Sequence, residues 1–311
     1  MRKLLLAAAT ACTLASSAAA QAPDTGPLVL LLPANTRAAA MGNAWVAGRD
    51  ETSVFYNPAQ INPTTGFGGR VVRYGSNGTL GTLASAVTLN WLTLGWGVQA
   101  VQFDARGDET YPYVPTDIVR SGTRGAQSLE VVAGGNFLIK KFRAGVGLKY
   151  AEDRVDALPN PIAAAPLSYL APSIQNGVVL GDVGVSHSLF SGTAALSVQN
   201  IGDNSHIEVP IQTTLGWARQ MQAKQLDLAF AGEVFARRNN WLGAGGGVEA
   251  GYGWIEGWSA ALRAGMRRTE TAGQRPIAVG ATLNADHLSV DYALEVFVGD
   301  RFAHHFSFRW R

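Results

Sequence analysis

Five histidines are the residues of this sequence that could hold a metal ion or transfer protons. They are His187, His206, His287, His304 and His305. None has the i, i+4 spacing with a neighbouring acid that marks a helical zinc protease. His304 and His305 are adjacent in an alternating segment, so their side chains face opposite sides and cannot grip one metal together. We therefore expect surface or interface histidines and no metal site.

The short motifs of common enzymes are also absent from the sequence. There is no G-x-S-x-G nucleophile turn, and no phosphate loop of the G-x-G-x-x-G or G-x-x-x-x-G-K-[ST] type. The run Gly243-Ala-Gly-Gly-Gly247 lies in an alternating segment, where glycine usually marks a bulge or close packing. We expect a protein that is not an enzyme, with no catalytic residues and no cofactor.

The N-terminus is typical of an exported protein. Residues 1–20 combine a basic start, an apolar stretch and a final Ala18-Ala19-Ala20, which predicts a secretory signal peptide. A lipid attached at Cys12 is the competing interpretation. Removing the signal peptide takes away two basic residues and leaves 25 − 2 = 23 basic against 23 acidic residues, with no cysteine. Nucleic acid is therefore not an expected partner, and disulfides are excluded.

Composition narrows the structural class further. Charged residues are only 15% of the chain, which contains 36 glycines, whereas soluble domains average about 25% charged residues. The longest apolar run after the signal peptide is Leu28–Leu32, far short of the ~20 residues that a membrane helix needs. Two classes remain, a soluble periplasmic β-protein and a transmembrane β-barrel.

From residue 67 onward the sequence alternates between apolar and polar or small residues. In Lys141–Tyr150, for example, Phe142 and Val146 fall on one face while Lys141 and Arg143 fall on the other. Most of these segments are longer than the ~5–6 residues of a soluble strand and suit a tilted membrane crossing of ~9–11 residues. We predict fourteen strands, at about 67–76, 79–89, 92–104, 126–138, 141–155, 175–190, 193–202, 209–221, 224–237, 241–254, 257–270, 275–285, 288–299 and 302–311.

The connections between these strands favour a membrane barrel over a two-sheet sandwich. Every second connection is short, whereas the two longest, 105–125 and 156–174, fall on the other side. Outer-membrane barrels have short periplasmic turns and longer external loops, and an even strand number places both termini in the periplasm. Aromatic residues near the predicted short turns and at the last strand fit an interfacial girdle: Trp91, Trp254, Trp258 and Trp310.

The segment before the first strand has a different composition. A fourteen-stranded barrel has an interior wider than its own side chains fill, and residues 21–66 are available to occupy it. Ala38–Ala47 contains helix-forming alanines, Asp50 is suited to cap a following turn, and Asn57-Pro58 initiates a turn. The expected organisation is a signal peptide (1–20), an N-terminal plug (21–66) and a barrel (67–311), all-β with a partly helical plug. The plug either only stabilises the barrel or also acts as a hatch that contacts cargo.

The predicted polar faces carry charges of both signs. Such a mixture indicates cross-strand ion pairs that hold plug and barrel together, with a substrate path as the alternative. The residues are Glu130, Lys141, Arg143, Lys149, Asp227, Glu233, Arg263, Arg267, Asp291, Glu295 and Arg309. The two long loops are the best candidates for partner contact, since exposed aromatic residues suit recognition; they contain Tyr111, Tyr113 and Tyr169.

One stretch of the plug resembles a known family. Arg37-Ala-Ala-Ala-Met-Gly42-Asn-Ala-Trp-Val-Ala47, followed by Asp50-Glu51 and Phe55-Tyr-Asn57-Pro58-Ala59, is similar to the N-terminal signature of the PorV/PorQ family, which belongs with the FadL-like outer-membrane proteins. Weaker similarity continues through 195–217 and 299–310. The sequence departs from the pattern at Asn43 and Gln60, where glycine is common.

The resemblance implies a fourteen-stranded barrel in the outer membrane of a diderm bacterium, with Arg37, Gly42, Asp50, Asn57 and Pro58 as motif residues of the plug. It also implies one of two roles. A PorV-like protein is a shuttle or accessory component of type IX secretion, with exported cargo proteins or secretion subunits as partners. A FadL-like protein transports hydrophobic small molecules such as fatty acids. The transporter predicts a continuous apolar path through the lumen; the shuttle predicts a blocked lumen and a conspicuous external loop surface.

Overall fold

The computed structural model describes residues 26–62, 67–75, 78–103, 126–155, 174–202, 209–238, 242–268, 274–297 and 302–310. The predicted signal peptide and the loop residues Tyr111, Tyr113 and Tyr169 lie outside these ranges. Among the described residues, no helix has the length and apolar character needed to cross a membrane.

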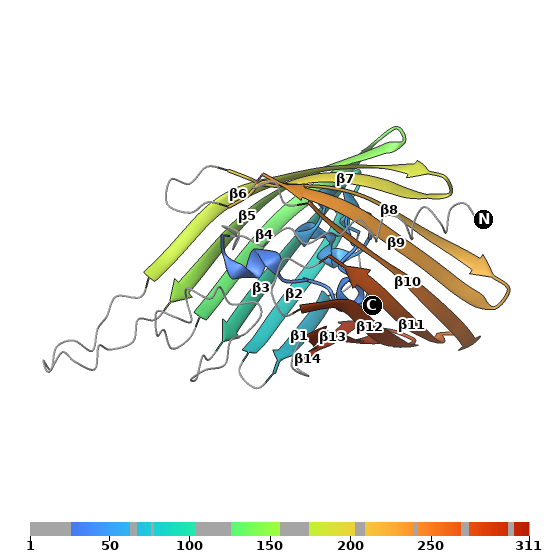
Figure 1. Ribbon diagram of the computed structural model, residues 1–311. Helices are drawn as coiled ribbons and strands as arrows, with labels where there is room; N and C mark the ends of the chain where they lie inside the picture. Colours follow the sequence, from blue (N-terminus) through green and yellow to red (C-terminus); the bar gives the residue numbers. More distant parts are fainter. Residues whose placement is uncertain are drawn as a thin grey trace, which may run out of the picture.

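The described residues form a closed antiparallel barrel of fourteen strands, as the alternation predicted (Figure 1). Each strand pairs with its neighbours in sequence, and the first pairs with the last to close the sheet. The predicted boundaries agree to within three residues. The strands are β1 (Phe67–Tyr74), β2 (Gly78–Leu89), β3 (Leu92–Phe103), β4 (Ala126–Ile139), β5 (Phe142–Val155), β6 (Ile174–Leu189), β7 (Gly192–Ile201), β8 (Gln212–Ala223), β9 (Leu226–Arg237), β10 (Leu242–Ile255), β11 (Trp258–Arg267), β12 (Gln274–Ala285), β13 (Leu288–Phe297) and β14 (Phe302–Trp310).

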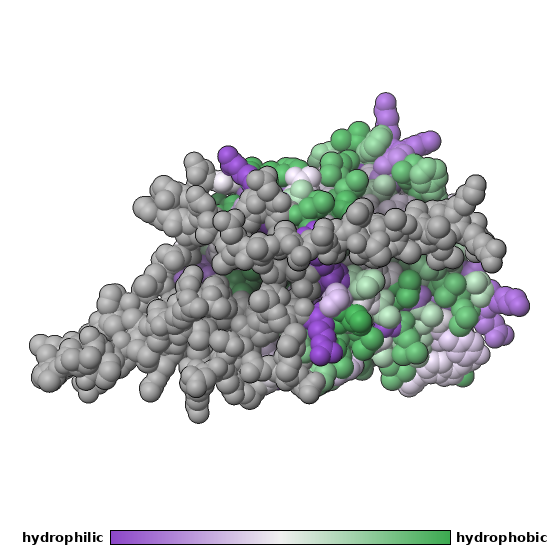
Figure 2. All heavy atoms as spheres, in the orientation of Figure 1, coloured by the Kyte–Doolittle hydropathy of each residue, from purple (hydrophilic) through white to green (hydrophobic). Residues whose placement is uncertain are grey.

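The strands turn their apolar faces outward and their polar or small faces into the lumen. On β13, Val290 is 43% exposed while the neighbouring Asp291 is 2% exposed. On β5, Val146 and Leu148 are exposed while Lys149 is buried. Hydrophobic residues cover much of the barrel surface that is coloured in Figure 2. This reversal of the usual soluble pattern is what a lipid-facing exterior requires.

One end of the barrel consists of tight turns. Asn90, Lys140, Ser191, Lys224 and Asp286 all have positive φ angles, between 48° and 59°. Left-handed residues are typical of two-residue hairpins, because their twist matches that of the flanking strands. The strand ends that border the longer connections all lie at the opposite end, called here the loop-bearing end.

Four tryptophans lie at the end of the barrel with short turns. Trp91 is 74% exposed beside its turn, and Trp254 and Trp258 flank another turn with half or nearly half of their surface exposed. Trp310 ends β14, where it pairs with Phe67 at the start of β1. Their positions match the predicted aromatic girdle.

Residues 26–62, called here the plug, lie inside the ring of strands (Figure 1). The plug contains η1 (Leu28–Leu31), α2 (Thr36–Ala40), η2 (Glu51–Phe55) and η3 (Pro58–Gln60). The helical character expected over Ala38–Ala47 extends only to Ala40. Gly42 and Asn43 take φ angles of 67° and 56°, which a right-handed helix does not admit.

Candidate functional site

The plug is packed against the wall at positions where the barrel has glycine. At Gly145, a Cβ atom would lie 2.4 Å from the backbone nitrogen of Ala59, so only glycine leaves room. The interpretation of the 243–247 run as close packing is confirmed: Gly245 contacts Gly42, and Gly247 contacts Met41. Lumen glycines at which a Cβ would come within 3 Å of the plug are Gly68, Gly95, Gly97, Gly145, Gly184, Gly216, Gly245, Gly247, Gly265 and Gly280.

The motif residues of the plug occupy distinct structural positions. Arg37 makes two parallel bonds to Glu249 of β10, at 2.8 and 2.7 Å. The backbone of Gly42 passes so close to β11 that its own Cβ would lie 2.3 Å from the carbonyl oxygen of Met266. Asp50 is the N-cap residue of η2. The side chain of Asn57 accepts a bond from Ala59 N at 3.0 Å, and Pro58 begins η3.

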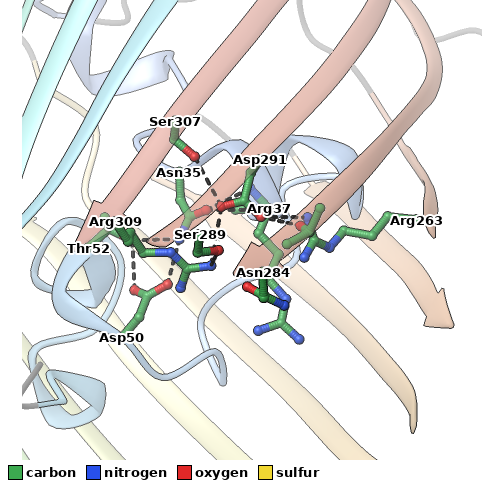
Figure 3. A network of polar contacts seen from close by, with 12 residues as sticks. Asn35, Arg37, Asp50, Thr52, Arg263, Asn284, Ser289, Asp291, Ser307 and Arg309 are labelled. Carbon is green, nitrogen blue, oxygen red and sulfur yellow. Dashed lines mark hydrogen bonds and ion pairs between the residues drawn. The ribbon is translucent and has the colours of Figure 1, made fainter. Parts of the chain in front are cut away.

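Ion pairs across the strands connect the motif to the wall (Figure 3). Arg263 bridges Glu249 and Asp291, with its Nη1 atom 2.9 Å from Asp291 Oδ1. Arg309 holds the other oxygen of Asp291 at 3.2 Å. The prediction that mixed charges form cross-strand pairs is therefore confirmed for these residues. Sequence reasoning missed Glu249, which occupies a lumen position of β10 by the same alternation.

A second network contains a buried histidine. His305 Nε2 lies 3.0 Å from Glu295, and its Nδ1 contacts Arg70, which donates in turn to the carbonyl oxygen of Pro33 in the plug. The expectation of a surface or interface position is wrong for His305, because it is fully buried in the lumen. His304 faces the other way and contacts Tyr292, as the alternation predicted. No group of metal-ligating side chains occurs in the described ranges.

Barrel side chains also satisfy the backbone of the plug. Glu233 accepts bonds from the amides of Trp45 and Val46, both at 3.0 Å. Asn136 donates to the carbonyls of Pro58 and Ile61 at 3.1 and 2.8 Å. These bonds matter because buried backbone groups without partners are costly. The sequence offered little signal for Asn136, since its partners are 75 and 78 positions away.

Tyr56 joins two parts of the plug. Its hydroxyl donates to Asn43 Oδ1 at 3.1 Å and accepts a bond from Ala34 N at 2.8 Å. Burial raises the pKa of Tyr56 well above its ordinary value. The phenol therefore stays protonated and keeps its donor role.

An apolar cluster lies in the lumen toward the loop-bearing end, where η1 meets the wall. The amide of Leu28 donates to Asp153 at 3.2 Å, and the amide of Val29 donates to Ser128 at 3.0 Å. These bonds fix η1 while its side chains pack on apolar wall residues. The apolar cluster comprises Leu28, Val29, Leu32, Val72, Tyr74, Leu80, Val101, Ala151, Val178, Leu180, Phe297 and Ala303.

Comparison with known proteins establishes the fold. No protein-family model and no curated protein sequence matches the chain. The toluene transporter TbuX of Ralstonia pickettii has a TM-score of 0.57 and 14% identity, over 89% of this chain and 98% of that chain. The CymD monoaromatic hydrocarbon channel has a TM-score of 0.59 and 11% identity, over 90% and 98%. A FadL homologue of Pseudomonas aeruginosa has a TM-score of 0.51 and 10% identity, over 91% and 98%. The fold is that of FadL-like barrels, and membership of the PorV/PorQ family stays a prediction.

Proposed function

We propose that this protein is an outer-membrane transporter that admits small hydrophobic molecules. The apolar cluster carries the proposal, because it is the largest of the three apolar clusters in the described part of the lumen and lies toward the loop-bearing end, whereas the two smaller ones pack the rest of the plug against the wall. The proteins of similar fold include transporters and channels for toluene and monoaromatic hydrocarbons. That similarity of fold supports the same class of substrate here.

The exterior of the barrel supports a location in the outer membrane. Its outward faces are apolar, and Trp91, Trp254, Trp258 and Trp310 lie near the end with short turns. A closed sheet leaves no strand edge unpaired in hydrocarbon, where each unsatisfied backbone group would cost several kcal/mol. We place the short turns in the periplasm and the longer connections outside the cell, as is usual in such barrels.

Within the plug, η1 is the element we expect to move during transport. The glycine contacts hold residues 40–61 of the plug against the wall, and none of those contacts involves η1. Instead, η1 is held by its apolar side chains and by amide bonds to Asp153 and Ser128. Burying a leucine or valine side chain stabilises the folded protein by roughly 1.5–3 kcal/mol. An apolar ligand that takes the place of Leu28 and Val29 in the cluster offsets the free energy lost when these side chains leave it.

A role as a type IX secretion shuttle is the second candidate. The motif from Arg37 to Ala59 favours it, and so does the close docking of that motif on lumen glycines, which fits the blocked lumen expected of a shuttle. Its partners would be exported cargo proteins or secretion subunits. The loop tyrosines proposed for their recognition lie outside the described residues.

Gentle detergent purification from the native outer membrane separates the two roles. Mass spectrometry would identify both co-purified proteins and bound small molecules. We expect a barrel that carries a stoichiometric apolar ligand and no protein partner. Recovery of large secreted proteins that share a C-terminal domain, without an apolar ligand, would overturn the transporter assignment.

A further inference from the structure

Glu130 of β4 stands out among the acids of the lumen. It is 4% exposed, and no residue in the described part of the chain forms a hydrogen bond or an ion pair with it. A buried carboxylate without a partner is strongly disfavoured. Its presence therefore requires a reason.

The other acids on the lumen face show what ordinary pairing looks like in this barrel. Asp291 has Arg263 and Arg309, and Glu295 has Arg267 and His305. Acids without an arginine partner, such as Glu233 and Asp153, accept amide hydrogens of the plug. Glu130 has neither kind of partner, although the same plug runs past it.

Its nearest charged neighbours are a lysine and a second acid. Lys149 and Asp182 both act electrostatically on Glu130, and they form a nearly fully buried ion pair with each other at 3.0 Å. One ammonium thus faces two carboxyl groups. On the far side of Asp182, Ser197 Oγ and Asn200 Oδ1 of β7 are buried oxygens for which the described residues supply no hydrogen bond.

A local distortion brings Asn200 to Asp182. The pairing of β6 with β7 shifts between Gly181 and Val183, and Asn200 takes a φ of 63°. That conformation lets the amide of Asn200 donate to Asp182 at 2.8 Å.

The apolar cluster begins one step along the same strands. On β6, Leu180 lies two residues from Asp182, on the side toward the loop-bearing end. On β5, Ala151 lies two residues from Lys149 in the same direction. Residues two apart on a strand share a face and lie about 7 Å from each other. The charged layer therefore forms the floor beneath the apolar cluster on this side of the lumen.

We infer that Glu130, Lys149 and Asp182 bind the polar end of an amphipathic ligand whose apolar body lies in the apolar cluster. The polar end of this ligand is a hydrogen-bond donor, either a hydroxyl or an amine. The inference rests on the proposed transport function and narrows its substrate class. A fatty acid carboxylate is disfavoured, because it would meet two carboxyl groups and a single ammonium that is already paired with Asp182.

Three probes with the same ten-carbon chain test the inference: decan-1-ol, decylamine and decanoate. Binding to the purified full chain in a nonionic detergent is measured by titration calorimetry. We expect the wild type to bind the amine and the alcohol at least about tenfold more tightly than the carboxylate, as one charge-assisted hydrogen bond would give. Glu130→Gln should reduce the preference for the amine over the carboxylate by about the same factor.

Asp227→Asn is the matched control, since it removes one carboxylate at an exposed position of β9 and should leave the ranking unchanged. Glu130→Gln should also unfold at the same or a higher temperature than the wild type, because it replaces a buried carboxyl group that has no hydrogen-bond partner among the described residues. Earlier unfolding or failure to fold would assign Glu130 a structural role and overturn the inference. A preference of the wild type for decanoate, or a ranking that Glu130→Gln leaves intact, would also overturn it while the transporter stands. Failure of all three probes to bind would overturn both proposals.

Discussion

Tyr56 links the middle of the plug to the residues just before α2, through Asn43 and Ala34. Asn43 occupies a left-handed position with φ of 56°, a conformation that glycine and asparagine adopt most readily. This explains why asparagine is accepted where the resembled family commonly has glycine. Asparagine adds a side-chain oxygen that Tyr56 uses.

The raised pKa of Tyr56 predicts a loss of stability in alkali. The group belongs to the plug and not to a strand. Its ordinary pKa is about 10, so above that pH the unfolded chain ionises first and stability falls as the pH rises. Chemical unfolding followed from pH 8 to 11 should show a steeper decline for the wild type than for Tyr56→Phe. Parallel declines would contradict this account.

Arg263 is predicted to be the most sensitive single charge of the lumen. It is buried between Glu249 and Asp291, and removing one member of a buried ion pair costs about 3–5 kcal/mol. We expect Arg263→Met to lower the free energy of unfolding by about that amount. Arg154→Met is the control, because Arg154 is half-exposed and its partner Glu152 keeps a hydrogen bond from Tyr150, so we expect a smaller loss. Equal losses in a urea titration would refute the assignment.

Individual residues were predictable only as far as the local pattern extends. The alternation along β13 and β14 placed Asp291, Glu295 and Arg309 in the lumen, where they lie. It also set His304 and His305 on opposite faces. It gave no means of knowing that His305 would meet Arg70, because those residues are 235 positions apart and become neighbours only when the barrel closes.

At the level of elements, the contact between η3 and β5 yields a matched pair of substitutions. Gly145→Ala would place a methyl group 2.4 Å from backbone atoms of Pro58 and Ala59, whereas the nearest atom at Gly147 is 3.6 Å away. We expect Gly145→Ala to displace the plug and lower stability by about 1–3 kcal/mol, as overpacking does, while Gly147→Ala has little effect. Limited proteolysis of the plug would report the displacement. Equal protection in both variants would count against close docking.

The strands were predictable as elements because alternation over long segments is a strong and local signal. The plug was not, because its form depends on the wall around it. The α2 helix stops at Ala40, where Gly42 must pass against β11. The Leu28–Leu32 run gave only the expectation that it is too short to span a membrane. In the structure this run supplies the plug side of the apolar cluster.

The whole molecule is asymmetric along its axis. Gly26 packs against Val209, in the connection from β7 to β8 at the loop-bearing end, whereas Trp310 lies beside the first residue of β1 at the end with short turns. The described N-terminal residues therefore lie far along the lumen from the C-terminal strand end. The periplasmic position of both chain termini stays a prediction.

Fold and function differed in how far the sequence determined them. Strand number and closure follow from alternation, length and turns. The role does not, because it depends on which side chains meet inside the lumen. The motif around Arg37 favours a shuttle, while the apolar cluster, assembled from η1 and seven strands, favours a transporter. Only a functional measurement separates a plug that stays in place from one that opens.

A reversible lock on η1 tests the central claim most directly. The lock is a disulfide introduced by Val29→Cys and Ser128→Cys, at two positions where the Val29 amide lies 3.0 Å from the Ser128 hydroxyl. The chain's one native cysteine, Cys12, lies in the predicted signal peptide and would not compete for this disulfide. Uptake of fluorescent N-phenylnaphthylamine is measured into vesicles with a lipopolysaccharide outer leaflet. We predict uptake through the reduced protein, its fall to the level of protein-free vesicles on oxidation, and recovery on reduction. Uptake that oxidation leaves unchanged, or that never exceeds the level of protein-free vesicles, would contradict a transporter gated by η1.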